Sequence, residues 1–274
     1  MAQYSFLGLS AFKTAITISD TVDDARLLAV LESVSRQAEL ACHRRFHPYS
    51  ATLYFEATHA DRLHLPVDLL SVTSLKTDND NDGVYENTWT TPTDYLLWPS
   101  NAAYDQTPFW RIDVARSSGR YSFPCGVQRG IENAGLWGFS LDLVAQSTLG
   151  AAITTTSTTS VTMSAGHALE AGHTILVDSE QIYITSVSTN TLTVERGVNG
   201  TTAATHLNAA TVSLYRYPGP VVEATRIQAA RIFQRVHAPF GITGSAELGT
   251  SAVISRIDPD VVGMLSDYRL ALVA

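Results

Sequence analysis

An acidic run in the first half of the chain carries the most regular pattern of potential ligands. Residues 78–83 read Asp-Asn-Asp-Asn-Asp-Gly, and Glu86 stands at the ninth position counted from the first of these. Carboxylates at alternate positions followed by glycine are typical of the start of a calcium-binding loop. The twelfth position is Trp89 instead of a bidentate glutamate, and the flanking residues are typical of strands.

A polar turn between two strands explains the same residues, because Asp, Asn and Gly are common turn formers. We therefore favour a structural turn and predict no metal. The alternative is a cation loop with these ligands: Asp78, Asp80, Asp82 and Glu86.

The sequence contains none of the compact motifs that mark common enzymes. A phosphate-binding loop, a zinc-protease helix, a serine-nucleophile elbow and paired CxxC motifs are all absent. Cys42 and Cys125 lie far apart and are predicted to be two buried thiols in a reducing compartment, with a disulfide between them as the alternative. His167, His173 and His206 are predicted to lie at the surface. We expect a protein that is not an enzyme and that uses no cofactor.

Composition and charge narrow the function classes further. Of the 274 residues, 45% are apolar and 16% are charged, which indicates a globular chain. The net charge of −8 disfavours a protein that binds nucleic acid through a basic surface. The sequence has no long uncharged apolar stretch and does not begin with a signal-peptide pattern, so we expect no membrane segment.

Periodicity divides the chain into helical and β-rich regions. A three-and-four spacing of apolar residues predicts a helix over 21–46, with a shorter helix before it at 10–16. Alternation and turn formers predict a small antiparallel sheet over 51–98 and a loop over 98–108. Helical spacing returns after Pro218 and again from Asp258.

The middle of the chain has a different composition. Nine of the sixteen residues from Thr148 to Met163 are Ser or Thr, and several short alternating runs follow. Turn residues at Asp178-Ser179, Thr189-Asn190 and Asn199-Gly200 separate these runs. We therefore predict an inserted all-β domain, a small barrel or sandwich, at residues 143–217.

The predicted fold class is α+β, with a helical adaptor domain that contains a small antiparallel β-sheet and is interrupted by the inserted domain. The first part of the helical domain would be residues 1–142 and its second part residues 218–274.

Several segments outside the inserted region follow one another in a recognisable order. They are Cys42–Phe46, Leu69–Asp78, Val84–Trp89, Asp94-Tyr95, Gly135–Ser140, Pro220–Ala224, Ala238–Gly241 and Ile257–Val261. In this order they resemble the head-tail connector or adaptor (head-completion) proteins of long-tailed bacteriophages. Members of that family pass almost directly from the Trp-Gly segment to the Pro-led helix, so the inserted domain is a departure. Two of its segments, Ile175–Gln181 and Thr191–Thr201, resemble a module that recurs in phage structural proteins.

The resemblance implies a structural virion protein at the neck, the head-tail interface, that is assembled in the host cytoplasm. It would form a homo-oligomeric ring, usually of about twelve copies, that lies below the portal, extends the DNA channel and provides the docking site for the tail. The implied partners are the portal protein, a tail terminator or stopper protein, and double-stranded DNA that passes through without specific binding. An acidic lumen suits such passage, because a basic one would hold DNA through many phosphate contacts.

The resemblance also implies that the C-terminal segment reaches the portal. The candidate contacts are the apolar anchors of that segment: Val261, Leu265, Tyr268 and Leu272. In an isolated subunit the same stripe would be part of the core, and this alternative stays open. A second function class also stays open: another tail or baseplate protein with a carbohydrate-binding β module, for which only Tyr183 and Tyr215 offer rings in the alternating strands.

Overall fold

The computed structural model describes residues 4–116, 119–235, 242–245, 250–253 and 257–270. Two compact units make up the chain. One is Arg44–Leu141, and the other combines Met1–His43 with Asp142–Leu270.

The unit at Arg44–Leu141 is an antiparallel sheet with one short helix, α3 (Ala102–Asp105). The strand order is β1-β6-β2-β5-β4, and β3 pairs with β2 off this path. The strands are β1 (Tyr49–Phe55), β2 (Arg62–Thr77), β3 (Asn87–Trp89), β4 (Tyr95–Trp98), β5 (Phe109–Val114) and β6 (Ile131–Trp137).

The long strand β2 organises this sheet, because it pairs with β3, β5 and β6. Alternation by itself favours two separate strands here, Arg62–Leu65 and Leu70–Lys76, whereas the structure has one continuous strand. The pairing register with β5 shifts between His64 and Leu69, which accommodates the break in the alternating pattern. Leu63, Leu69 and Leu75 are fully or almost fully buried in the core of the unit.

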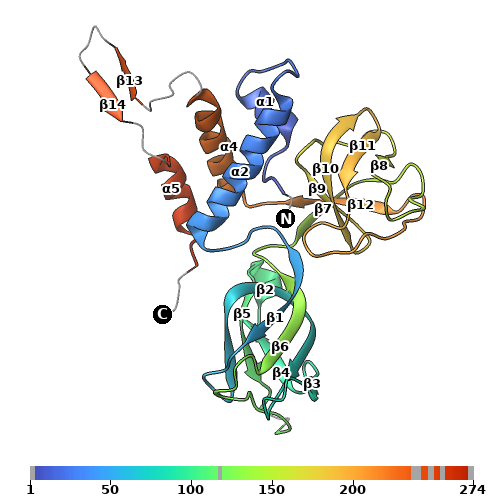
Figure 1. Cartoon of the computed structure of the whole chain (residues 1–274), viewed down its shortest axis with the longest axis vertical. Helices are drawn as coiled ribbons and strands as arrows, with labels where there is room; N and C mark the ends of the chain where they lie inside the picture. The colour runs from blue at the N-terminus through green and yellow to red at the C-terminus, as the bar shows by residue number, and fades with distance from the viewer. Residues whose placement is uncertain (1–3, 117–118, 236–241, 246–249, 254–256, 271–274) are drawn as a thin grey trace. The chain divides into compact units, whose positions relative to one another are not determined.

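The second unit contains helices α1 (Leu9–Ala15), α2 (Asp24–Cys42), α4 (Gly219–Gln234) and α5 (Pro259–Ser266). α2 packs against α1, α4 and α5 (Figure 1). Its inward stripe is the one that the spacing predicted, with Leu27, Leu31 and Val34 buried. A two-stranded sheet, β13 (Ile242–Ser245) with β14 (Thr250–Val253), lies between α4 and α5 in the sequence.

The same unit contains a second six-stranded antiparallel sheet with the order β7-β12-β9-β10-β11-β8. The predicted turns at Asp178, Thr189 and Asn199 all occur, and each of these residues has a positive φ. The strands of this sheet enclose a hydrophobic core of their own, in which Ile175, Ile182 and Val212 are completely buried. The strands are β7 (Asp142–Thr148), β8 (Ser160–Thr162), β9 (Thr174–Val177), β10 (Glu180–Ser188), β11 (Thr191–Glu195) and β12 (Thr211–Arg216).

Hydrogen bonds attach this sheet to the helices. The Leu9 amide donates to the Ala171 carbonyl at 2.9 Å, and the Ala11 amide donates to the Glu170 carboxylate at 3.0 Å. The carboxylate therefore serves as the N-cap acceptor of α1, which Gly8 cannot supply. The Tyr183 hydroxyl donates to Glu32 of α2 at 2.5 Å, and burial followed by this bond raises the pKa of Tyr183.

The predicted fold class is wrong. Over the residues that the structure describes, the chain is mostly β, with two six-stranded antiparallel sheets, and these residues form no helical adaptor domain with a small sheet attached. The sheet of residues 44–141 forms a unit by itself, while the helices on both sides of it in the sequence pack together with β7–β12. Helical periodicity located α1, α2, α4 and α5 but could not show that the intervening strands form a core independent of them.

The described part of the chain contains no helix with both the length and the apolar composition needed to cross a membrane. Cys42 is buried, as predicted, whereas Cys125 is exposed. The autonomy of residues 143–217 as an inserted domain stays a prediction.

Gly135 of β6 marks the closest backbone approach in the first sheet. A Cβ atom at this position would lie 2.2 Å from the Ser71 carbonyl oxygen of β2. We predict that Gly135→Ala lowers the free energy of unfolding by about 1–3 kcal/mol, because paired strands cannot separate without losing hydrogen bonds. Gly219→Ala is the matched control, since no atom lies within 4 Å of its added Cβ. Equal stability of the two variants in chemical denaturation would contradict this account of the strand pair.

Candidate functional site

The acidic run folds into the turn between β2 and β3. Asp78 is buried, whereas Asp80, Asp82 and Glu86 are exposed. The structure brings one potential ligand atom from each of these four residues within 4.8 Å of the others. The sequence therefore identified a real cluster of carboxylates.

Backbone amides already occupy the oxygens of Asp78. Oδ1 accepts from the Asn81 amide at 2.7 Å, and Oδ2 accepts from the Gly83 amide at 2.9 Å. Burial raises the pKa of Asp78, but the amide hydrogen bonds outweigh burial, and the net pKa is lowered. Asn81 and Gly83 have positive φ, as the tight turn requires. These contacts explain the loop as a structural turn, and cation binding stays an untested alternative.

We predict that Asp78→Asn lowers the melting temperature by several degrees, because one amide would then face an N–H donor instead of an acceptor. In the double variant Asp80→Asn, Asp82→Asn, an oxygen remains available to accept from the Val84 amide. This control should melt like the wild type.

Adding calcium tests the alternative in the same melting experiments. The structural turn predicts no shift in the melting temperature. A rise of several degrees in the wild type that is lost in the double variant would show that the loop binds the ion.

The predicted portal contacts lie at the C-terminal end. Val261 and Leu265 of α5 are 3% and 4% exposed. They face Ala38 of α2 and Ala224 of α4 across a small apolar space. Tyr268 is half-buried, and Leu272 lies outside the described residues.

Polar contacts also hold this end of the chain. The Asp258 side chain accepts from the Asp260 amide and pairs with Arg231 of α4, and the Leu270 amide donates to the Cys42 carbonyl at 2.9 Å. Together with these polar contacts, the buried side chains of Val261 and Leu265 hold α5 against α2 and α4 of the same chain. Portal contact by this segment stays a prediction.

Replacing Leu265 tests this packing. We predict that Leu265→Ala lowers the free energy of unfolding by about 2–4 kcal/mol, because it leaves a cavity between three helices. Val262→Ala, on the exposed side of the same helix at 51% exposure, should change it by less than about 0.5 kcal/mol. If chemical denaturation finds both changes neutral, α5 is not packed as described.

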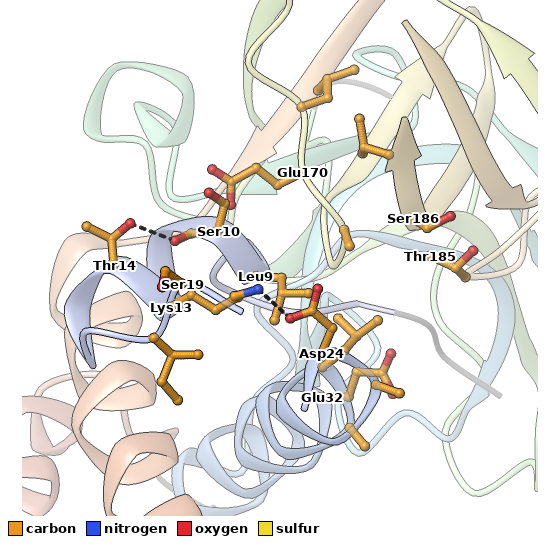
Figure 2. Close-up of a pocket in the computed structure, with 17 residues that line it drawn as sticks. Leu9, Ser10, Lys13, Thr14, Ser19, Asp24, Glu32, Glu170, Thr185 and Ser186 are labelled. Carbon is orange, nitrogen blue, oxygen red and sulfur yellow. Dashed lines mark hydrogen bonds and ion pairs between the residues drawn. The ribbon is translucent and has the colours of Figure 1, made fainter. Parts of the chain in front are cut away.

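A groove of about 960 Å³ lies between α1, the first half of α2, the loop residues 169–171 before β9, and residues 185–187 of β10 (Figure 2). Apolar side chains of Leu9, Leu28 and Val187 line part of it. Lys13 pairs with Asp24 at 2.5 Å, and the Thr14 hydroxyl donates to the Ser10 carbonyl. The remaining charged residues that line it are Glu32 and Glu170. The groove thus presents hydroxyls, carboxylates and one neutralised lysine around an apolar floor.

His173 is hydrogen-bonded to Glu170, one of the residues that line the groove. Its Nδ1 accepts from the Glu170 amide at 3.1 Å, so this nitrogen carries no proton in the folded state. Burial lowers the pKa of His173, and the nearby Glu170 carboxylate only partly opposes this effect. The sequence predicted a surface histidine, and the structure places it half-buried.

We predict that the attachment of α1 to the Glu170 loop depends on pH. Because the folded pKa of His173 lies below the unfolded value, its contribution to stability is present above about pH 6.5 and is lost as the pH falls through the folded pKa. We predict that the Leu9 and Ala11 amides lose protection from hydrogen exchange on acidification. Glutamine can accept the same bond without titrating, so His173→Gln should reduce this loss. Equal loss in both proteins would contradict the role of His173.

The aromatic side chains of β7–β12 do not form a stacking surface. Tyr183 is 1% exposed and Tyr215 is 5% exposed. The carbohydrate-binding alternative relied on these two rings. Their burial removes its support.

Comparisons with known proteins give one distant likeness. No model of a known protein family matches the chain, and no curated protein matches it. Among solved structures, the chain is similar to one described as "Neck of empty GTA particle computed with C6 symmetry". The sequence identity is 14%, the match covers 98% of this chain and 92% of that chain, and the TM-score is 0.44.

Proposed function

We propose that this chain is a structural protein of the neck of a tailed phage particle. In this role it is a head-tail adaptor, a ring of about twelve copies below the portal that extends the DNA channel and provides the docking site for the tail. It acts by assembly and not by catalysis.

The observation that supports the proposal is the position of the segments that carry the family resemblance. Leu69–Asp78 contains the second half of β2, and Gly135–Ser140 contains the end of β6. These strands pair, with Leu69 opposite Trp137 and Val72 opposite Gly135. The resembling segments therefore contact each other in the framework of the first unit.

The second unit shows the same relation. Pro220–Ala224 begins α4, and Ile257–Val261 leads into α5. Ala224, Ile257 and Val261 line one apolar space against α2. Segments that are far apart in the sequence thus pack together in the core. This is expected if the resembling segments form the same fold as in the adaptor family. These contacts, and not the distant structural neighbour, support the proposal.

The charge balance suits a DNA channel. With a net charge of −8, the chain lacks the excess of basic residues that binds phosphates over a wide surface. DNA can then pass through the ring without being held. The proposed partners are the portal protein on one side and a tail terminator or stopper protein on the other.

The C-terminal segment provides the most direct test of the adaptor role. We predict that phage carrying a chain truncated before Asp258 produce filled heads that lack tails and lose DNA, because the adaptor cannot join the portal. Gly135→Ala phage are the control for simple loss of stability, because that substitution leaves the C-terminal segment intact. Thin-section electron microscopy and particle counts would measure the result. Normal tailed particles from the truncated chain would contradict the portal contact.

A further inference from the structure

The groove between α1, α2 and β10 has two negative charges that no described side chain balances. Lys13 is paired with Asp24 at 2.5 Å, so these two charges cancel. The other charged residues that line the groove are Glu32 and Glu170, which Figure 2 shows on either side of the Lys13–Asp24 pair. Each accepts a hydrogen bond from a neutral donor, a tyrosine hydroxyl or a backbone amide, and neither forms an ion pair with a described residue. A ligand that matches the groove is therefore cationic.

The surface between these charges is apolar. Ala25 and Ala29 lie about one turn apart on α2 and are exposed, and Leu28 between them is half-buried. On β10, Val187 also lines the groove and is half-buried. Because alanine side chains are short, this face of α2 leaves room for apolar side chains of another molecule. A ligand that fills the groove therefore combines cationic and apolar groups.

The part of β10 that lines the groove also has an open backbone edge. At Ile184 this edge is still paired, since the Ile184 amide donates to the His173 carbonyl at 2.9 Å and its carbonyl accepts from the Gly172 amide at 2.8 Å. The next carbonyl back along the chain, that of Ala171, instead accepts from the Leu9 amide of α1 at 2.9 Å. The chain before Gly172 thus leaves β10, and the edge beyond Ile184 has no neighbouring strand.

The backbone of Val187 faces this open edge. The register with β11 shifts just before Ser186, and Val187 then pairs with Leu192. The Val194 amide of β11 donates to the Thr159 carbonyl next to β8 at 2.8 Å. Because alternate residues of a strand direct their backbone groups to the same side, those of Leu192 also point to β8. The Val187 amide and carbonyl therefore face away from β11, and neither has a partner among the described residues.

These three features together select an extended polypeptide as the ligand. An extended chain can pair its backbone with an open sheet edge, which a small cation without amide groups cannot do. Its side chains alternate between two faces. Basic side chains on one face can therefore reach the carboxylates, while apolar side chains on the other cover the apolar surface.

We propose that this groove binds an extended segment of a partner protein, in which lysine or arginine alternates with apolar residues, and that the segment pairs with β10 at Val187. The residues that line the groove do not include any from the C-terminal segment that is proposed to contact the portal. The two surfaces are therefore independent, and loss of one leaves the other in place.

Three labelled synthetic peptides test the proposal by fluorescence anisotropy with the whole chain. Valine and lysine alternate in the first, glutamate replaces lysine in the second, and the third is the lysine peptide with every backbone amide N-methylated. We expect the lysine peptide to bind at low ionic strength and the other two to bind at least about tenfold more weakly. In hydrogen exchange, the Val187 amide should become protected when the lysine peptide binds.

A double variant of the chain tests the place of binding. In Glu32→Gln, Glu170→Gln, each side chain loses its charge but keeps an oxygen that accepts its existing hydrogen bond. We expect this variant to bind the lysine peptide about tenfold more weakly than the wild type. Glu195→Gln, Glu223→Gln is the matched control, because it removes the same charge outside the groove. It should bind like the wild type.

Each part of the proposal has its own contrary result. A wild type that does not bind the lysine peptide at about 1 mM would overturn the groove as a peptide site. Equal binding of the glutamate peptide would overturn the charge match. Equal binding of the N-methylated peptide, or an unprotected Val187 amide in the complex, would overturn the strand pairing. Equal weakening in both double variants would show attraction to the net charge of the chain and not to the groove.

Discussion

The buried apolar stripe of α2 holds together the unit that combines residues 4–43 with 142–270. Leu27, Leu31 and Val34 pack into the core that α1 and α4 share, and further along the helix Ala38 contacts α5. Glu32, on the same helix, accepts a hydrogen bond from the Tyr183 hydroxyl of the second sheet. One helix therefore holds together elements from both ends of the sequence. The helices that follow β12, α4 and α5, pack on it.

The sequence predicted this helix and most strands of the second sheet, because their patterns are local. The spacing of α2 and the turn residues after β9, β10 and β11 need no knowledge of distant contacts. The carboxylates of the Asp78–Glu86 turn were also found from spacing alone. Their hydrogen bonds to backbone amides then show how the turn is held.

Elements that depend on distant partners were missed. β6 reads Ile-Glu-Asn-Ala-Gly-Leu-Trp, with few β-branched residues, and it forms a strand because β1 and β2 lie on both sides of it. The fold class failed for the same reason, since a sheet with its own core gives no sign in the sequence that it is separate from the helices. His206 was expected at the surface, and only tertiary structure brings Asp178 and Glu180 to its two nitrogens. Val261 and Leu265 are buried against residues of α2 and α4 within the chain, and portal contact by this segment stays a prediction.

The proposed neck role agrees with the two well-packed units, since a protein that works by assembly needs rigid subunits more than a reactive site. Electron cryomicroscopy of intact particles, with the chain located by a small fused tag, tests this claim most directly. The account predicts tag density in a ring around an open channel at the head-tail junction. Tag density in a fibre, in a trimer or along the tail would contradict it.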